Sequence, residues 1–337
     1  MKSWRESASI IIAAKNGQKY HATQSQYNYN LLFLKRKKEA KFSGAYVFPG
    51  GVIEIADAHL KWQNLYKNYG FNENSFKSLF PNTKSRPHIF NSRENELPRE
   101  ISLRIAAIRE TFEECGVLLC EQSSEISDKA HHFPISSDDL EFWQKEVHGD
   151  PNEFFNMCEQ LHCWPNLWAL HEWTNWLSPT LFPAARRFNT AFFFATMTQI
   201  PSSKLDFSEV EEILWATPEY VKKSLIDYLP PPQLYEVNIL EKYKNIDDLY
   251  KYALIKSRKG VQLYFPVVTE LSDGKAILLP GDQMYPETVN LYEQEVVDKS
   301  NLTIKQFNEM SGAVNRLEFS NEGNKSLQIR TSMASKL

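Results

Sequence analysis

The segment from Arg109 to Val117 constrains this chain more than any other, because it places three carboxylates on one face of a short helix. At about 100° per residue, Glu113 and Glu114 fall about 60° and about 40° to either side of Glu110. Pro98 suits a first helical turn, and Gly116 suits the position just after the last one. The opposite face carries only apolar side chains and a cysteine, namely Ile101, Ile105, Ile108, Phe112 and Cys115.

These carboxylates predict a divalent metal site. Neighbouring carboxylates repel one another, so each resists ionisation unless a cation neutralises the group. Magnesium and manganese prefer oxygen ligands and bind through a few carboxylates, water and substrate phosphate. Arg109 lies four residues before Glu113 and can orient that carboxylate. The alternative is a solvated acidic helix face, which has the same pattern.

A glycine pair upstream favours the metal site. Residues 46–49 predict an apolar strand that runs into a rigid turn, and Gly50-Gly51 lets the backbone approach a ligand closely. Together with Arg109 and the three glutamates, these residues resemble the Nudix box, a loop, helix and loop. Asp57 stands five residues beyond Gly51, where the box has a glutamate. Whether it replaces that glutamate is left open by the sequence.

The Nudix box is interrupted in this chain, because many more than the usual seven residues separate Asp57 from Arg109. Closing such a loop costs only about 1.8 kcal/mol more, since loop-closure entropy grows logarithmically. We expect an insertion at residues 58–98, with a helix from Ala58 to Tyr69 and then a polar stretch. Its place in the box predicts a lid or a surface excursion where substrate enters.

The resemblance extends to the peroxisomal Nudix coenzyme A diphosphatases of the motif-19 subfamily. It is carried by the interrupted box and by residues 176–179, 186–193, 209–218 and 229–233. It implies an α/β (α+β) Nudix fold, a mixed β-sheet flanked by helices. The implied reaction is metal-dependent hydrolysis of the diphosphate bond of coenzyme A and acyl-coenzyme A, giving 3′,5′-ADP and (acyl-)4′-phosphopantetheine.

The resemblance also implies roles for the residues of the box. Glu110, Glu113 and Glu114, with the backbone carbonyl of Gly50, would hold Mg²⁺ or Mn²⁺, and Arg109 would act beside them. Glu110 or a downstream acid would take a proton from the attacking water. The downstream candidates are Glu209, Glu211 and Glu212, although their pattern favours a surface acidic turn.

Two basic pairs are candidates for binding substrate phosphates. Arg186 and Arg187 can form bidentate contacts with phosphate, or they can be an outward-facing pair at a strand edge. Lys35 and Arg36 lie between two expected strands and can reach a nucleotide, or they can belong to a solvated hairpin.

Three sections are expected along the chain. Residues 5–229 would form the Nudix domain, residues 230–318 a C-terminal extension packed on the core, and residues 319–337 a flexible tail. The tail ends in Ser335-Lys336-Leu337, an address read by the peroxisomal import receptor. The sequence therefore predicts a peroxisomal protein.

Periodicity predicts the elements around the box. We expect strands at residues 8–14, 29–34, 117–120, 167–177 and 187–197, with two helices between residues 140 and 163. Further helices are expected at residues 218–228 and from the triple proline at 230–232 to residue 255. Strands are expected at residues 262–268 and 276–279.

Composition excludes several classes of protein. A net charge of −4 argues against a nucleic-acid binder that neutralises phosphates. No apolar run of about 18 residues is present, so no membrane span is expected. The cysteines raise the question of zinc, but their spacing favours reduced core thiols: Cys115, Cys120, Cys158 and Cys163. The Cys-x-x-Cys zinc ribbon of the Nudix NADH diphosphatases is absent from the sequence.

Two alternatives remain at this stage. A Nudix diphosphatase acting on NADH or ADP-ribose would share the acidic helix and ignore the pantetheine arm. A non-catalytic nucleotide-binding Nudix protein would be expected to have lost glutamates from the box, and all three are present.

Overall fold

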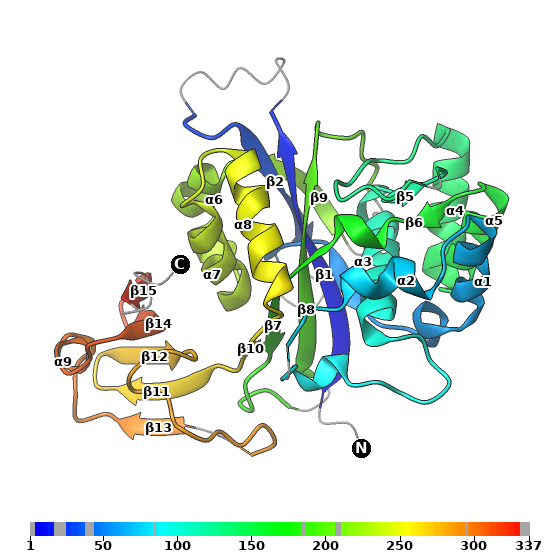
Figure 1. Cartoon of the computed structure of the whole chain (residues 1–337). Coiled ribbons are helices and arrows are strands. Elements are labelled where there is room, and N and C mark those ends of the chain that lie inside the picture. The colour runs from blue at the N-terminus through cyan, green and yellow to red at the C-terminus, as the bar shows by residue number, and fades with distance from the viewer. Residues whose placement is uncertain are drawn as a thin grey trace.

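The computed structural model describes residues 4–16, 25–37, 44–83, 85–123, 125–183, 186–205, 210–293 and 296–330. A mixed eight-stranded sheet lies at its centre, between two groups of helices (Figure 1). The strand order is β10-β7-β8-β1-β2-β3, with β4 paired to β1 and β9 paired to β2. These strands are β1 (Arg5–Lys15), β2 (Tyr29–Arg36), β3 (Tyr46–Val47), β4 (Gly50–Val52), β7 (His171–Leu177), β8 (Phe188–Met197), β9 (Val210–Ala216) and β10 (Leu263–Tyr264).

Strand β1 lies in the middle of this sheet, and both of its faces are buried. It pairs in parallel with β8, from Arg5 opposite Phe188 to Ala14 opposite Met197. Its alternate side chains enter two different apolar cores, since successive strand residues point to opposite faces. Ile10 and Ile12 pack in the core with α3 (Arg99–Cys115), and Ile11 packs in the core with α7 (Pro231–Leu240).

The helices divide between the two faces of the sheet. Helix α3 packs on one face, together with α1 (Lys61–Asn68), α2 (Glu73–Phe76), α4 (Ser137–Gly149) and α5 (Glu153–Gln160) (Figure 1). Helices α6 (Pro218–Ser224), α7 and α8 (Ile246–Arg258) cover the other face. The expectation of a mixed sheet flanked by helices is confirmed. None of the described helices is both long and apolar enough to cross a membrane.

The insertion at residues 58–98 is part of the core, so the expectation of a surface excursion is wrong. Trp62 and Tyr66 on α1 are each 1% exposed. Trp62 packs against Phe155, and Tyr66 packs against Trp168. These aromatic partners lie about a hundred residues further along the chain, which is why the sequence did not reveal the packing.

The C-terminal residues form a second sheet, with the order β13-β11-β12-β14-β15. Its elements are β11 (Val267–Leu271), β12 (Gly274–Leu278), β13 (Val296–Lys299), α9 (Ile304–Glu309), β14 (Val314–Ser320) and β15 (Lys325–Arg330). Leu279 and Leu317 join the core beneath α7, so this extension packs on the first sheet.

The expected start of the flexible tail, at residue 319, is too early, because β14 and β15 pair as far as Arg330. The polar composition of this region was misleading. Arg316 is fully buried and forms a two-bond ion pair with Asp282, with both nitrogen–oxygen distances 2.7 Å. Residues 331–337, which include Ser335-Lys336-Leu337, lie outside the described residues.

Most of the other expected elements are present with shifted ends. The strand expected at residues 117–120 is reduced to β5 (Cys120–Glu121), which pairs with β6 (Trp164–Pro165). The strand expected at residues 167–177 begins with a 3₁₀ turn over Leu167–Ala169 and becomes β7 only at His171. The two helices between residues 140 and 163 are confirmed as α4 and α5.

Burial of the insertion yields a stability prediction. Replacing Trp62 by Ala leaves a cavity and removes a hydrogen bond, because its indole N–H donates to the Ala56 carbonyl at 3.0 Å. We expect a loss of about 3–5 kcal/mol in unfolding free energy, measured in urea. Leu60→Ala is the control in the same segment, since Leu60 is 42% exposed, and it should cost less than about 0.5 kcal/mol. Equal effects of the two changes would contradict a core role for the insertion.

Candidate active site

Helix α3 carries the four charged residues of the box on one short stretch. Pro98 is its N-cap, and Gly116 ends it in the left-handed conformation, with φ 70°. The Gly116 N–H donates to the Phe112 carbonyl at 2.8 Å, as is typical of a helix that ends at a left-handed glycine. The predicted helix is therefore confirmed, with its first helical residue at Arg99.

Arg109 joins the two halves of the interrupted box. It is 1% exposed and forms a bidentate ion pair with Asp57, which is also 1% exposed. Nε donates to Oδ1 of Asp57 and a terminal nitrogen donates to Oδ2, each at 2.8 Å. A further bond from Arg109 reaches the Val52 carbonyl at 3.0 Å. The structure thus places Asp57 as the acid that anchors Arg109, which the sequence had left open.

The same guanidinium organises two of the glutamates. Its other terminal nitrogen lies 2.6 Å from Oε1 of Glu113 and 2.9 Å from Oε1 of Glu110. Burial raises the pKa of both Glu110 and Glu113 to about 7, and the positive charge of Arg109 only partly opposes it. The orienting role predicted for Arg109 toward Glu113 is confirmed by this contact.

The two glycines of the loop make room for the acidic helix. The Gly50 N–H donates to Oε2 of Glu114 at 2.8 Å. Gly50 has φ 149°, and a Cβ there would lie 2.3 Å from the Ala8 carbonyl oxygen. A Cβ on Gly51 would lie 2.2 Å from Oε2 of Glu110. Any side chain at either position would therefore displace the strand or the carboxylate.

The donor set fits a hard divalent cation. Four carboxylates, Asp57, Glu110, Glu113 and Glu114, face two guanidinium groups, those of Arg109 and of Arg36. A terminal nitrogen of Arg36 lies 3.1 Å from Oε1 of Glu114 and forms an ion pair with it. This excess of buried negative charge favours bound metal. Glu110, Glu113 and Glu114 can supply carboxylate ligands, and the Gly50 carbonyl stays a predicted one.

A cavity of about 1100 Å³ opens beside these glutamates. Beside the glutamates its lining includes Arg36, which pairs with Glu114, and His148 from α4, next to Glu113. The lining also includes the cations Arg5 and Lys37, apolar side chains from β7, β8, β11 and β12, and the polar residues Ser178, Thr190 and Gln233. No described residue of the insertion at 58–98 belongs to the lining, so the expectation of a lid is also wrong.

The predicted substrate-binding residues fall in different places. Arg36 lines the cavity, whereas Lys35 lies outside its lining and pairs with Glu211 at 3.5 Å. The two residues are adjacent, but the register of β2 against β9 shifts between them, and only Arg36 reaches the cavity. Lys35 instead pairs with Glu211 on β9, which corrects its predicted role in substrate binding.

The arginine pair at 186–187 also lies outside the cavity lining. Arg187 is buried, and it donates to the carbonyls of Ser178 at 3.0 Å and Leu291 at 2.8 Å. It thereby ties the end of β7 to the C-terminal extension. Arg186 is exposed. The structure therefore gives Arg187 a structural role in place of the substrate-binding role expected for the pair.

The downstream acids do not reach the cavity within the described residues. Glu212 accepts a hydrogen bond from the Tyr46 hydroxyl at 2.8 Å, and Glu211 pairs with Lys35. Glu209 lies outside the described residues. Glu110 therefore remains the candidate base that the structure places at the cavity.

Sequence reasoning missed three polar side chains in the lining: Arg5, Glu54 and His148. Arg5 begins the strand that pairs with the Gly50-Gly51 loop, and Nδ1 of His148 lies 4.0 Å from Oε2 of Glu113. Arg5 and His148 are isolated in sequence from the box. No local signal distinguished them from surface residues.

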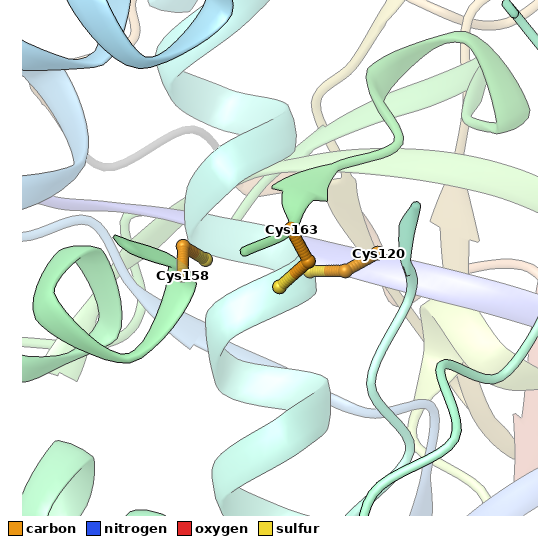
Figure 2. A group of neighbouring side chains, drawn as sticks. All are labelled: Cys120, Cys158 and Cys163. Atoms are coloured by element: carbon orange, nitrogen blue, oxygen red, sulfur yellow. The ribbon is translucent and has the colours of Figure 1, made fainter. Parts of the chain in front are cut away.

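Three cysteines form a separate cluster beside α3 (Figure 2). The sulfurs of Cys120, Cys158 and Cys163 all lie within 4.8 Å of one another and are buried. Hydrogen bonds from Cys120 and Cys158 lower the pKa of Cys163 to about 5. No fourth His, Cys, Asp or Glu among the described residues joins the group, whereas structural zinc takes four ligands. All four cysteines are free and buried, which confirms the prediction of core thiols.

Comparisons with known proteins agree with the box. Residues 4–240 match the family model described as the NUDT19 Nudix domain, and residues 269–330 match the NUDT19 C-terminal domain. A Xenopus laevis protein named acyl-coenzyme A diphosphatase NUDT19 is 34% identical over 346 residues, covering 94% of this chain and 90% of that protein. A Homo sapiens protein of the same name is 33% identical, covering 86% of this chain and 82% of that protein.

A solved structure supports the fold. The Nudix hydrolase from Alicyclobacillus acidocaldarius superposes with a TM-score of 0.52 at 17% identity, covering 74% of this chain and 97% of that chain. The expected Nudix fold is confirmed by this likeness together with the family match.

The Arg109–Asp57 pair yields a second stability prediction. Asp57→Ala leaves a buried guanidinium without its main partner, which should cost about 3–5 kcal/mol in unfolding free energy. Asp57→Glu is the matched control, because it restores a carboxylate and should recover most of the loss. Urea unfolding of both variants measures the difference. A cost below about 1 kcal/mol for Asp57→Ala would contradict the anchoring role.

Proposed function

This chain belongs to the NUDT19 group of Nudix hydrolases, and we propose that it hydrolyses the diphosphate bond of coenzyme A and of acyl-coenzyme A. Water adds to one phosphorus, the bond from that phosphorus to the bridging oxygen breaks, and the bridging oxygen leaves with the other phosphate. The products are 3′,5′-ADP and 4′-phosphopantetheine or its acyl form. The names of relatives 33–34% identical over most of the chain support this reaction.

One observation in the geometry carries the proposal. The three glutamates of α3 line a cavity whose lining combines the cations Arg5, Arg36 and Lys37 with a large share of apolar side chains. A diphosphate with an apolar extension fits both parts of that lining. The metal-binding glutamates alone would fit any Nudix substrate.

Nudix hydrolases generally use divalent metal, and we propose Mg²⁺ or Mn²⁺ held by Glu110, Glu113 and Glu114 with the Gly50 carbonyl. Such an ion polarises a phosphoryl oxygen and lowers the pKa of the attacking water. Arg109 fixes Glu110 and Glu113 while Asp57 holds Arg109 in place. Arg36 pairs with Glu114 and lines the cavity, where its guanidinium would contact a substrate phosphate. Arg5 and Lys37 add positive charge to the same lining.

Product analysis tests the reaction. Purified protein with Mg²⁺ is incubated separately with free coenzyme A, an acyl-coenzyme A, NADH and ADP-ribose. We expect 3′,5′-ADP from the first two. Cleavage of NADH or ADP-ribose alone would overturn the proposed substrate and keep the metal chemistry, and no cleavage at all would favour a non-catalytic nucleotide-binding protein.

In the same assay, Glu114→Gln should lower kcat by at least about 100-fold. A loss of about 3 kcal/mol of metal-dependent stabilisation of the transition state has that effect. Glu211→Gln is the control, because Glu211 is exposed and lies outside the cavity lining. It should leave turnover within about twofold. Circular dichroism checks that both variants fold. Near-normal activity of Glu114→Gln would refute the assignment of the metal site.

We also propose that the protein is imported into peroxisomes through its last residues, Ser335-Lys336-Leu337. A free C-terminal tripeptide of this kind is bound by the import receptor. The test fuses a fluorescent protein to the N-terminal end and compares the full chain with a chain lacking residues 335–337. We expect punctate peroxisomal signal only for the full chain. Ser332→Ala, a change in the same tail outside the tripeptide, serves as the control, and punctate signal from the shortened chain would contradict the proposal.

A further inference from the structure

The apolar part of the active-site cavity is built by both sheets of the molecule. Four of its side chains come from the first sheet, at the end of β7 and in the first half of β8, and two come from the C-terminal sheet. These residues are Trp176, Leu177, Phe188, Phe192, Val268 and Ile277, which we call the apolar wall. Val268 on β11 and Ile277 on β12 lie directly opposite each other in the antiparallel pair. The C-terminal sheet therefore contributes one continuous patch to the cavity.

Several contacts hold the two sheets in register at this wall. Strand β10 pairs in parallel with β7, with Tyr264 opposite Trp176, and β11 follows two residues later. Arg187 bridges from the end of β7 to the Leu291 carbonyl in the C-terminal extension. The patch on β11 and β12 is thus fixed relative to the end of β7.

The Trp176 ring is itself held rigidly. Its indole N–H donates to Glu236 at 2.9 Å, and its ring stacks on Tyr264 with the centroids 4.9 Å apart. Glu236 is 1% exposed and also accepts bonds from Trp173 and Thr174, at 2.6 Å and 2.7 Å. The wall is consequently formed before any ligand arrives, which reduces the entropy lost on binding.

The mouth of the cavity continues the apolar surface. Leu181 and Phe182 line the cavity and are 43% and 46% exposed. Large apolar side chains that remain exposed beside a cavity indicate a site for an apolar ligand. Proline rings at residues 230–232 complete this region of the lining.

We propose that the apolar wall binds the acyl chain of acyl-coenzyme A, with the C-terminal sheet supplying the residues that select for it. This inference rests on the proposed function. Nicotinamide, adenine and ribose need hydrogen-bonding partners, and the aliphatic side chains of Leu177, Val268 and Ile277 offer none. An alkyl chain needs only apolar surface. Each methylene buried against the wall strengthens binding roughly fourfold.

The test measures kcat/KM for free coenzyme A and for its six-carbon and twelve-carbon saturated acyl esters, in the full chain with Mg²⁺. The wild-type value should rise at least tenfold from free coenzyme A to the longer ester. Ile277→Gln should lower the value for that ester at least fivefold and leave free coenzyme A within twofold. Ile277→Ala should show a smaller loss of the same kind, and it keeps the test valid if the Gln variant does not fold.

Val297→Gln is the matched control. Val297 is a half-buried β-branched residue on β13 of the same sheet, and it lies outside the cavity lining. It should leave the preference for the acyl esters unchanged. The same selective loss in this control, an equal loss for free coenzyme A in the Ile277 variants, or no loss in them would each overturn the acyl-chain assignment. Failure of the wild type to cleave any coenzyme A substrate would instead overturn the proposed function.

Discussion

The buried ion pair between Arg109 and Asp57 is the contact on which the active site depends. Two charges taken out of water are tolerated only when their geometry satisfies both, and here the pairing is bidentate. Through it, the loop after Gly51 is fastened to α3, and the remaining donors of Arg109 are directed at Glu110 and Glu113. The long insertion between Asp57 and Arg109 therefore does not separate the two halves of the box in space.

The insertion and the C-terminal sheet support the site in different ways. The described residues of the insertion at 58–98 enlarge the core beside α3 through aromatic packing and are not part of the cavity lining. The C-terminal sheet lies on the other side of the first sheet from α3 (Figure 1), and its residues Val268 and Ile277 line the cavity. The first addition stabilises the catalytic helix, and the second shapes the substrate site. Neither role follows from the Nudix box alone.

Prediction from sequence was most successful where a feature is local. The acidic face of α3 follows from the spacing of Glu110, Glu113 and Glu114, and its end follows from Gly116. It was least successful for charged side chains near strand ends. Lys35 and Arg36 are adjacent basic residues, yet Arg36 pairs with Glu114 and Lys35 pairs with Glu211, and the register of β2 against β9 shifts between them. Nothing in the sequence around Arg187 indicated that its guanidinium would donate to two backbone carbonyls.

The sequence by itself determined the catalytic helix and the Nudix family of the chain, because these depend on short spacings. The need for glycine at positions 50 and 51 is tertiary, because the atoms that crowd them belong to Ala8 and Glu110. Tertiary structure decided that Asp57 anchors Arg109, that Arg5 and His148 reach the cavity, and that the second sheet forms part of its wall. These contacts join residues far apart along the chain. Their pairing is set by how the two sheets and α3 pack, which periodicity within one segment does not encode.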